Sequence, residues 1–192
     1  MTEAARAILF ALATRRLLAA DELGLATGHP SRVLDAALAE LAQGGLVAPS
    51  PSDASRLRLT PQGEEQALAA VATERAALAA QLAPLYLEFA PLNRDVKAAV
   101  SRWQLGSGHA SSLLGELGGA HRRALPLLDR LAGLRPRYAS LRARLASAMA
   151  RVEAGETSYV AGVTVDSFHS VWWQLHADLL AVLGRERGEA DL

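Results

Sequence analysis

The sequence predicts a mainly helical protein with one small β-hairpin in its first third, and three observations support this fold class. Hydrophobic residues make up 51% of the 192 residues but aromatic residues only 5%, so alanine and leucine supply most of the apolar surface. Both are strong helix formers, whereas β-branched residues are few. Apolar residues also recur at helical spacing along most of the chain. This length is enough for one or two domains with cores of their own.

Three helices are predicted first. Thr2 is a candidate N-cap for a helix to about Leu18, with an apolar stripe formed by Ala5, Ile8, Leu9, Leu12 and Leu17. A shorter helix opens at Asp21 and ends in the turn from Thr27 to Pro30. Ser31 is the candidate N-cap of the third helix, which buries Val33, Leu34, Ala37, Leu38 and Leu41. Gly44-Gly45 ends it, because glycine adopts the left-handed cap conformation without a steric penalty.

A hairpin and a fourth helix follow. Leu46-Val47 and Leu57 to Leu59 are the two predicted strands, joined by a Pro/Ser/Asp-rich tip from Pro49 to Ser55. Thr60 and Pro61 then open a helix, since threonine caps well and proline is favoured at the first helical position.

This segment resembles the winged helix-turn-helix of MarR- and PadR-like transcriptional regulators. The resemblance is carried by L-x-x-L-x-x-x-G-L-V, from Leu38 to Val47, and by L-T-P-x-G, from Leu59 to Gly63, and it covers roughly the first 80 residues. It implies that the third helix enters the DNA major groove and that the hairpin forms a two-stranded wing. The candidate DNA-binding residues are Arg15, Arg16, Ser31, Arg32, Gln43, Arg56 and Arg58.

The charge pattern argues against base reading. The exposed face of the third helix also carries Asp35 and Glu40 beside alanines, a poor set for contacting base edges. Residues 1–75 hold 7 Lys/Arg and 9 Asp/Glu, a net charge of 7 − 9 = −2. Two interpretations of Arg56 and Arg58 therefore stay open: contact with a minor groove or phosphates, or the solvated side of an edge strand.

The remaining chain predicts a helical bundle, and we place a domain boundary between residues 80 and 81. Residues 1–80 form the winged domain and 81–192 a helical effector-binding and dimerisation domain. We expect a helix from Gln66 to about Leu87, kinked at Pro84 and ended by Pro91. The further predicted helices are Leu92–Leu105, Ser111–Leu134 (one helix or two pieces), Tyr138–Ala154 and Val165–Leu183, with a break at Gly106–Gly108 and a frayed polar tail after Gly184.

A polar stripe on the last helix is the candidate ligand site. Asp166, His169, Trp173 and His176 fall on one stripe at about 100° per residue. With Trp103 they would line a pocket for an effector with an aromatic body and a polar head. The two histidines lie about 10 Å apart along the axis, too far to share one metal ion. The alternative is that this stripe is core and that a neighbour satisfies each histidine.

A second cluster is basic and consists of Arg122, Arg123, Arg130, Arg135, Arg137, Arg142 and Arg144. It would bind phosphate, an anionic effector or flanking DNA, or else it is a solvated helix face paired with acids from elsewhere.

Several classes of function are disfavoured. The chain has no cysteine, no apolar run of the roughly 20 residues that span a bilayer, and no signal peptide. Walker, G-x-S-x-G and H-E-x-x-H motifs are missing, so we expect no enzyme, catalytic residue, cofactor or metal. The leading hypothesis is a cytoplasmic, homodimeric DNA-binding regulator, with control by a small-molecule effector as a further expectation. The alternatives are a winged-helix module that docks a protein partner, and a small-ligand-binding helical domain.

Overall fold

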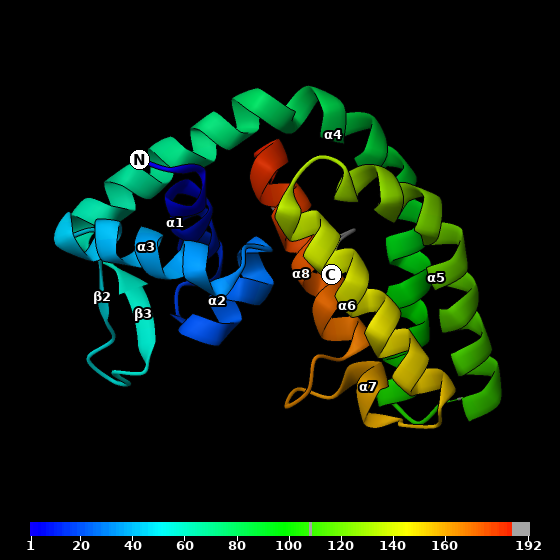
Figure 1. The fold of residues 1–192 in the computed structure, drawn as a ribbon. Coiled ribbons are helices and arrows are strands. Elements are labelled where there is room, and N and C mark those ends of the chain that lie inside the picture. The colour runs from blue at the N-terminus through cyan, green and yellow to red at the C-terminus, as the bar shows by residue number, and fades with distance from the viewer. Residues whose placement is uncertain (108, 186–192) are drawn as a thin grey trace. The chain divides into compact units, whose positions relative to one another are not determined.

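The computed structural model describes residues 1–107 and 109–185, and these are mainly helical with a small antiparallel sheet (Figure 1). The fold class predicted from the sequence is therefore confirmed. The chain divides into two compact units: residues 1–79 with 181–184, and residues 80–180 with Arg185 among the described residues. The predicted break at Gly106–Gly108 falls between two helices, since one ends at Gln104 and the next begins at Ala110, and Gly106 has φ 63°. Gly108 itself and residues 186–192 of the predicted tail lie outside the described residues.

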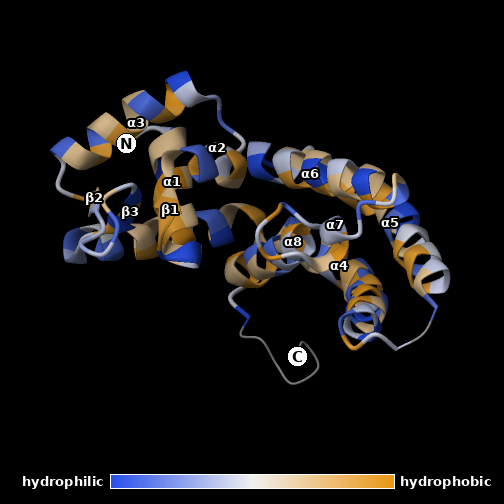
Figure 2. Cartoon of the chain, turned by 90° about the horizontal axis from the view of Figure 1, so that it is seen from below, coloured by the Kyte–Doolittle hydropathy of each residue, from blue (hydrophilic) through white to orange (hydrophobic). Residues whose placement is uncertain are grey.

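The first unit contains α1 (Glu3–Arg15), β1 (Leu18–Ala19), α2 (Ala20–Thr27), α3 (Ser31–Gln43), β2 (Val47–Pro49), β3 (Arg56–Leu59) and the start of α4 (Pro61–Gln104). The strand order is β1-β3-β2, with Leu18 opposite Leu57 and Val47 opposite Leu59. The two predicted strands are present, but β1 was not predicted. Figure 2 shows α1 mostly in hydrophobic colours, and its Ile8, Leu9 and Leu12 lie in the core of this unit.

The end of α1 corrects the predicted boundary at Leu18. The helix stops at Arg15 because Leu18 and Ala19 pair with β3 instead. The reversal is made at Arg16, the described residue other than glycine with a positive φ (φ 66°, ψ −48°). The Leu17 amide donates to the Arg15 carbonyl at 2.8 Å, which closes a three-residue γ-turn. This turn conformation is rare and strained for an L-amino acid.

The helix caps agree with the sequence in part. Thr2 caps α1, since its Oγ1 accepts from the Ala5 amide at 3.2 Å. The prediction for Ser31 is wrong: Pro30 occupies the cap position of α3, and Ser31 is the first helical residue. Proline fits there because the cap residue has an extended backbone (φ −69°, ψ 150°) and because the helix does not need an N–H from this position, which proline lacks. Gly45 has the expected left-handed conformation, with φ 66°.

The L-T-P-x-G segment fastens α4 to the turn after α3. The Thr60 amide donates to the Leu46 carbonyl at 3.0 Å, and its hydroxyl donates to the Gly45 carbonyl at 2.7 Å. The same hydroxyl accepts from the Gly63 amide at 3.0 Å. A Cβ on Gly63 would lie 1.9 Å from the Leu46 carbonyl oxygen, so only glycine fits. The two halves of the sequence motif are thus one structural contact.

Helix α4 continues through both prolines, which corrects the predicted end at Pro91 and the separate helix from Leu92. Pro84 and Pro91 are seven residues apart and both are exposed, so they lie on the solvent side of the helix. There the carbonyls that lose an intrahelical hydrogen bond can bond to water. The opposite face is buried through Leu82, Phe89 and Val96, and this burial favours a continuous helix.

The second unit is a helical bundle around α8 (Phe168–Leu183), formed with the C-terminal part of α4, α5 (Ala110–Ala132) and α6 (Pro136–Glu153). Trp172 of α8 stacks on Phe89 at 5.1 Å and donates from Nε1 to the Asn93 Oδ1 at 3.0 Å. Phe168 of α8 meets His121 of α5 edge-on at 5.6 Å. Helix α5 is a single piece, and the short α7 (Ser158–Ala161) was not predicted. None of the described helices combines the length and apolarity that crossing a membrane requires.

Candidate nucleic-acid interface and ligand sites

Helix α3 buries one face and leaves the other open to solvent. Its buried residues are Leu34, Ala37 and Leu41, and its exposed ones include Ser31, Arg32, Asp35, Ala36, Ala39, Glu40 and Gln43. Glu40 is partly engaged, since it accepts from the Thr2 hydroxyl at 3.3 Å and lies 3.6 Å from the N-terminal amine. Arg32 has no polar partner among the described residues. The open face therefore offers one free cation among acids and small residues.

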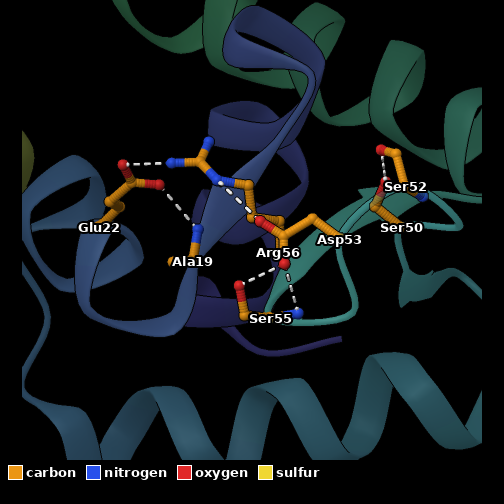
Figure 3. Close-up of polar contacts among 7 residues, drawn as sticks. All are labelled: Ala19, Glu22, Ser50, Ser52, Asp53, Ser55 and Arg56. Carbon is orange, nitrogen blue, oxygen red and sulfur yellow. Dashed lines mark hydrogen bonds and ion pairs between the residues drawn. The ribbon is translucent and has the colours of Figure 1, made fainter.

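The β2–β3 hairpin holds its first arginine against α2 rather than leaving it free (Figure 3). Arg56 Nη2 donates to Glu22 Oε1 at 2.8 Å, and Asp53 Oδ2 lies 3.9 Å from Arg56 Nε. The other Glu22 oxygen accepts from the Ala19 amide at 2.8 Å, which ties the start of α2 to the same contact. Hydrogen bonds from the Ser55 side chain and backbone lower the pKa of Asp53 and keep the hairpin tip anionic. Sequence reasoning missed the role of Glu22.

The other predicted DNA contacts lie apart from α3. Arg58 donates from Nη1 to the Leu59 carbonyl at 3.1 Å, and its Nε is buried without a partner among the described residues. Arg58 and Arg16 line one pocket beneath the hairpin, whereas Arg15 is half-buried at the end of α1. Of the predicted set, only Ser31, Arg32 and Gln43 share the open face of α3.

The predicted ligand stripe on α8 does not stay on one face of the bundle. His176 is buried, stacks on Tyr86 and lies 3.2 Å from its hydroxyl, whereas Trp173 is 47% exposed. Asp166 precedes α8 and accepts from Arg144 Nε at 2.7 Å. His169 is half-buried, and Trp103 lines a small cavity whose walls come from α4, α5 and α7. For His176 and Asp166, neighbouring side chains supply the partners that the core interpretation requires.

The basic segment is largely paired with carboxylates. Arg123 pairs with Asp95 of α4, and Arg130 with Glu88 of the same helix. Arg142 pairs with Asp129 of α5. Arg122 is exposed, and Arg135 donates to the Leu134 carbonyl at 2.8 Å. These contacts agree with a solvated helix face rather than with a free anion-binding surface.

A buried polar seam between α6 and α8 was not predicted. Arg137 Nε donates to Asp178 Oδ2 at 2.9 Å, with side chains only 7% and 12% exposed. Tyr138 is almost wholly buried beside this pair, and burial raises the pKa of its hydroxyl well above the usual 10.0. Arg144 of α6 forms a second pair with Asp166, which precedes α8 and whose side chain is 39% exposed. The arginines are seven residues apart, which places them on one face of α6, but the sequence gives no sign of which acids they meet.

Two histidines of the second unit predict that the stability of the fold depends on pH. Burial lowers the pKa of both His121 and His169 below the usual 6.5. For His121, the charges of Arg122 and Arg142 lower the pKa further, whereas the carboxylate of Glu153 acts in the opposite direction. Each histidine then binds its proton more weakly in the folded than in the unfolded chain, so stability is fully present above about pH 6.5 and falls as the pH drops through the lowered folded pKa.

Urea unfolding at pH 7.5 and pH 5.5 measures this loss, and His121→Leu should reduce it. The exposed His109→Gln is the matched control and should leave it unchanged. An equal pH dependence in wild type and His121→Leu would contradict the role assigned to His121.

Comparisons with known proteins place no family on this arrangement: no protein-family model matches the chain, and neither the curated proteins nor the solved structures yield a match. Within the described residues, no group of three or more His, Asp or Glu side chains is arranged to hold a metal ion.

Proposed function

We propose that this chain is a double-stranded DNA-binding regulator whose first unit is a winged helix-turn-helix. The observation that carries the proposal is the order of elements. Helix α2 is followed by a tight turn at Gly28–Pro30, an amphipathic α3 with an open face, and the antiparallel hairpin β2–β3, whose strand β3 also pairs with β1. Units of this kind insert the second helix of the pair into the major groove.

The first turn of α3 is the part best suited to contact phosphate. No side chain caps this helix, so its first backbone N–H groups lack a side-chain acceptor. Such groups and the helix dipole favour an anion, and Arg32 stands beside them. Because Arg56 is held by Glu22, few cations remain for the DNA backbone, and we expect modest affinity with little base discrimination.

Selection from genomic fragments followed by a salt titration tests this proposal. Each phosphate contact contributes a slope of about −0.9 in log K against log salt, so Arg32→Ala should make the slope shallower by about 1 and weaken binding to all sequences. Arg94→Ala, at an exposed position of α4, is the control and should change neither quantity. A folded protein that binds no DNA at low salt would contradict the proposal.

A protein-docking module is the second candidate, favoured by Asp35 and Glu40 on α3 and by a hairpin tip without a cation. Glu22→Gln separates the two candidates. It removes the carboxylate that pairs with Arg56, so it should strengthen DNA binding if the hairpin lies against the duplex. Arg56→Ala should not strengthen DNA binding, because it removes the cation itself. If neither variant alters a measurable DNA affinity, the hairpin does not contact DNA.

We also propose that the second unit mediates a homodimer. Trp173 on α8 is 47% exposed and Leu87 on α4 is 70% exposed, and tryptophan is enriched at protein–protein interfaces, which supports self-association. Sedimentation equilibrium of wild type against Leu87→Asp measures it, with a shift toward monomer as the expected result.

A further inference from the structure

The first unit contains an open pocket of about 570 Å³ between the end of α1, the hairpin and the first turns of α4. Its apolar walls include Leu12, Leu59 and Leu68, and the last of these is 73% exposed to solvent. A volume of this size lies in the range that small-molecule sites occupy. No residue of the predicted ligand stripe on α8 contributes to it.

Two arginines and one acid supply the charged part of the pocket. Arg16 and Arg58 both line it, and neither forms an ion pair within the described residues. Arg58 Nε is buried and has no hydrogen-bond partner there. Glu64, from the first turn of α4, also lines the pocket. The net charge of these three groups is 2 − 1 = +1, which suits one negative charge rather than two.

Among the described residues, the one other than glycine that has a positive φ lies at this pocket. Arg16 sits in the γ-turn with φ 66°, although glycine would adopt this conformation more easily. Strained conformations of this kind cluster at ligand-binding positions, where they aim a side chain. Here the strained residue contributes one of the two unpaired guanidinium groups.

We propose that this pocket binds a small amphipathic monocarboxylate, with its carboxylate between Arg16 and Arg58 and its apolar body against Leu12, Leu59 and Leu68. A guanidinium binds a carboxylate through paired, charge-assisted hydrogen bonds, which would satisfy the buried Arg58 Nε. The site is independent of DNA binding, so its test needs no DNA.

Isothermal titration of the full chain with 2-naphthoate and with the uncharged 2-naphthamide tests the proposal. The acid should bind and the amide should bind at least about tenfold more weakly, since it lacks the charge-assisted hydrogen bonds. The dianion 2,6-naphthalenedicarboxylate should also bind more weakly than the monoacid, because Glu64 opposes its second charge.

Three variants locate the site. Arg58→Gln and Arg16→Gly should each weaken 2-naphthoate binding about tenfold or more. Arg16→Gly should at the same time raise the melting temperature, because glycine relieves the strained turn; loss of binding with gain of stability cannot come from misfolding. Arg32→Gln removes an exposed arginine outside the pocket and should leave binding unchanged.

Equal binding of the acid and the amide would overturn the proposal, and so would unchanged binding in both pocket variants. The absence of any 2-naphthoate binding at millimolar concentration to the folded chain would overturn it for this class of ligand. These outcomes concern the ligand alone, so they leave the DNA-binding proposal to its own experiment.

Discussion

Replacing Gly63 with alanine is expected to destabilise the first unit by roughly 3 kcal/mol or more. The new Cβ would lie 1.9 Å from the Leu46 carbonyl oxygen and 2.9 Å from its carbonyl carbon, and both belong to backbone. Neither side can move easily, because Thr60 fixes the same turn through hydrogen bonds to Gly45 and Leu46. Relief of the clash would separate α4 from the turn after α3.

Hydrogen exchange and urea unfolding followed by circular dichroism measure this effect. The Thr60 amide, which donates to Leu46, should lose protection in Gly63→Ala. Gly115→Ala is the matched control: it is also within a helix, but a Cβ there meets nothing within 4 Å. That control should stabilise its helix by about 0.5–1 kcal/mol. Equal effects of the two substitutions would show that the close approach to Leu46 is not what requires glycine at position 63.

Replacing Asp178 with alanine is expected to destabilise the second unit by about 3–5 kcal/mol. The change removes the carboxylate that Arg137 Nε meets at 2.9 Å and leaves a guanidinium that is only 7% exposed. Removing one partner of a buried ion pair is strongly destabilising, because the remaining charge has given up its hydration and loses its counter-charge. Fluorescence of Trp172 and Trp173, on the same helix as Asp178, reports the unfolding in urea.

Two further variants show whether burial of the pair is the cause. Asp129→Ala breaks the ion pair with Arg142, whose side chains are 41% and 56% exposed, and should cost less than about 1 kcal/mol. The double variant Arg137→Met/Asp178→Leu removes both buried charges and should recover most of the stability. If Asp178→Ala costs no more than Asp129→Ala, the buried pair does not stabilise the bundle as proposed.

Local signals predicted the elements of the first unit well, because glycine, proline and capping residues act within a few residues of their position. Thr2, Gly45 and Thr60 each have the conformation or contact expected from their type. β1 escaped prediction because two residues carry no periodicity, and the strand exists only by pairing with β3. The helix end predicted at Pro91 is wrong, because the effect of a proline on a helix depends on whether it lies on the solvent side or on the buried side.

The candidate sites show the limit of prediction from residue type and spacing. Arg56 and Arg58 alternate along one strand, yet Glu22 holds the first while the second lines a pocket. The α8 stripe has the spacing of one helix face, but His176 packs on Tyr86 while Trp173 reaches solvent. The partners that decide these environments lie 34 residues from Arg56 and 90 residues from His176 along the chain.

The sequence by itself determined that this protein is mainly helical, that a hairpin follows its third helix, and that glycine is required where the chain turns after that helix. These features depend on backbone preferences and on apolar spacing, which each residue expresses locally. Only the tertiary structure decided which arginines are paired with acids, which histidines are buried, and that Arg16 and Arg58 line the same pocket. The physical reason is that charge pairing and desolvation depend on neighbours brought together by packing, and the order of residues along the chain does not specify them.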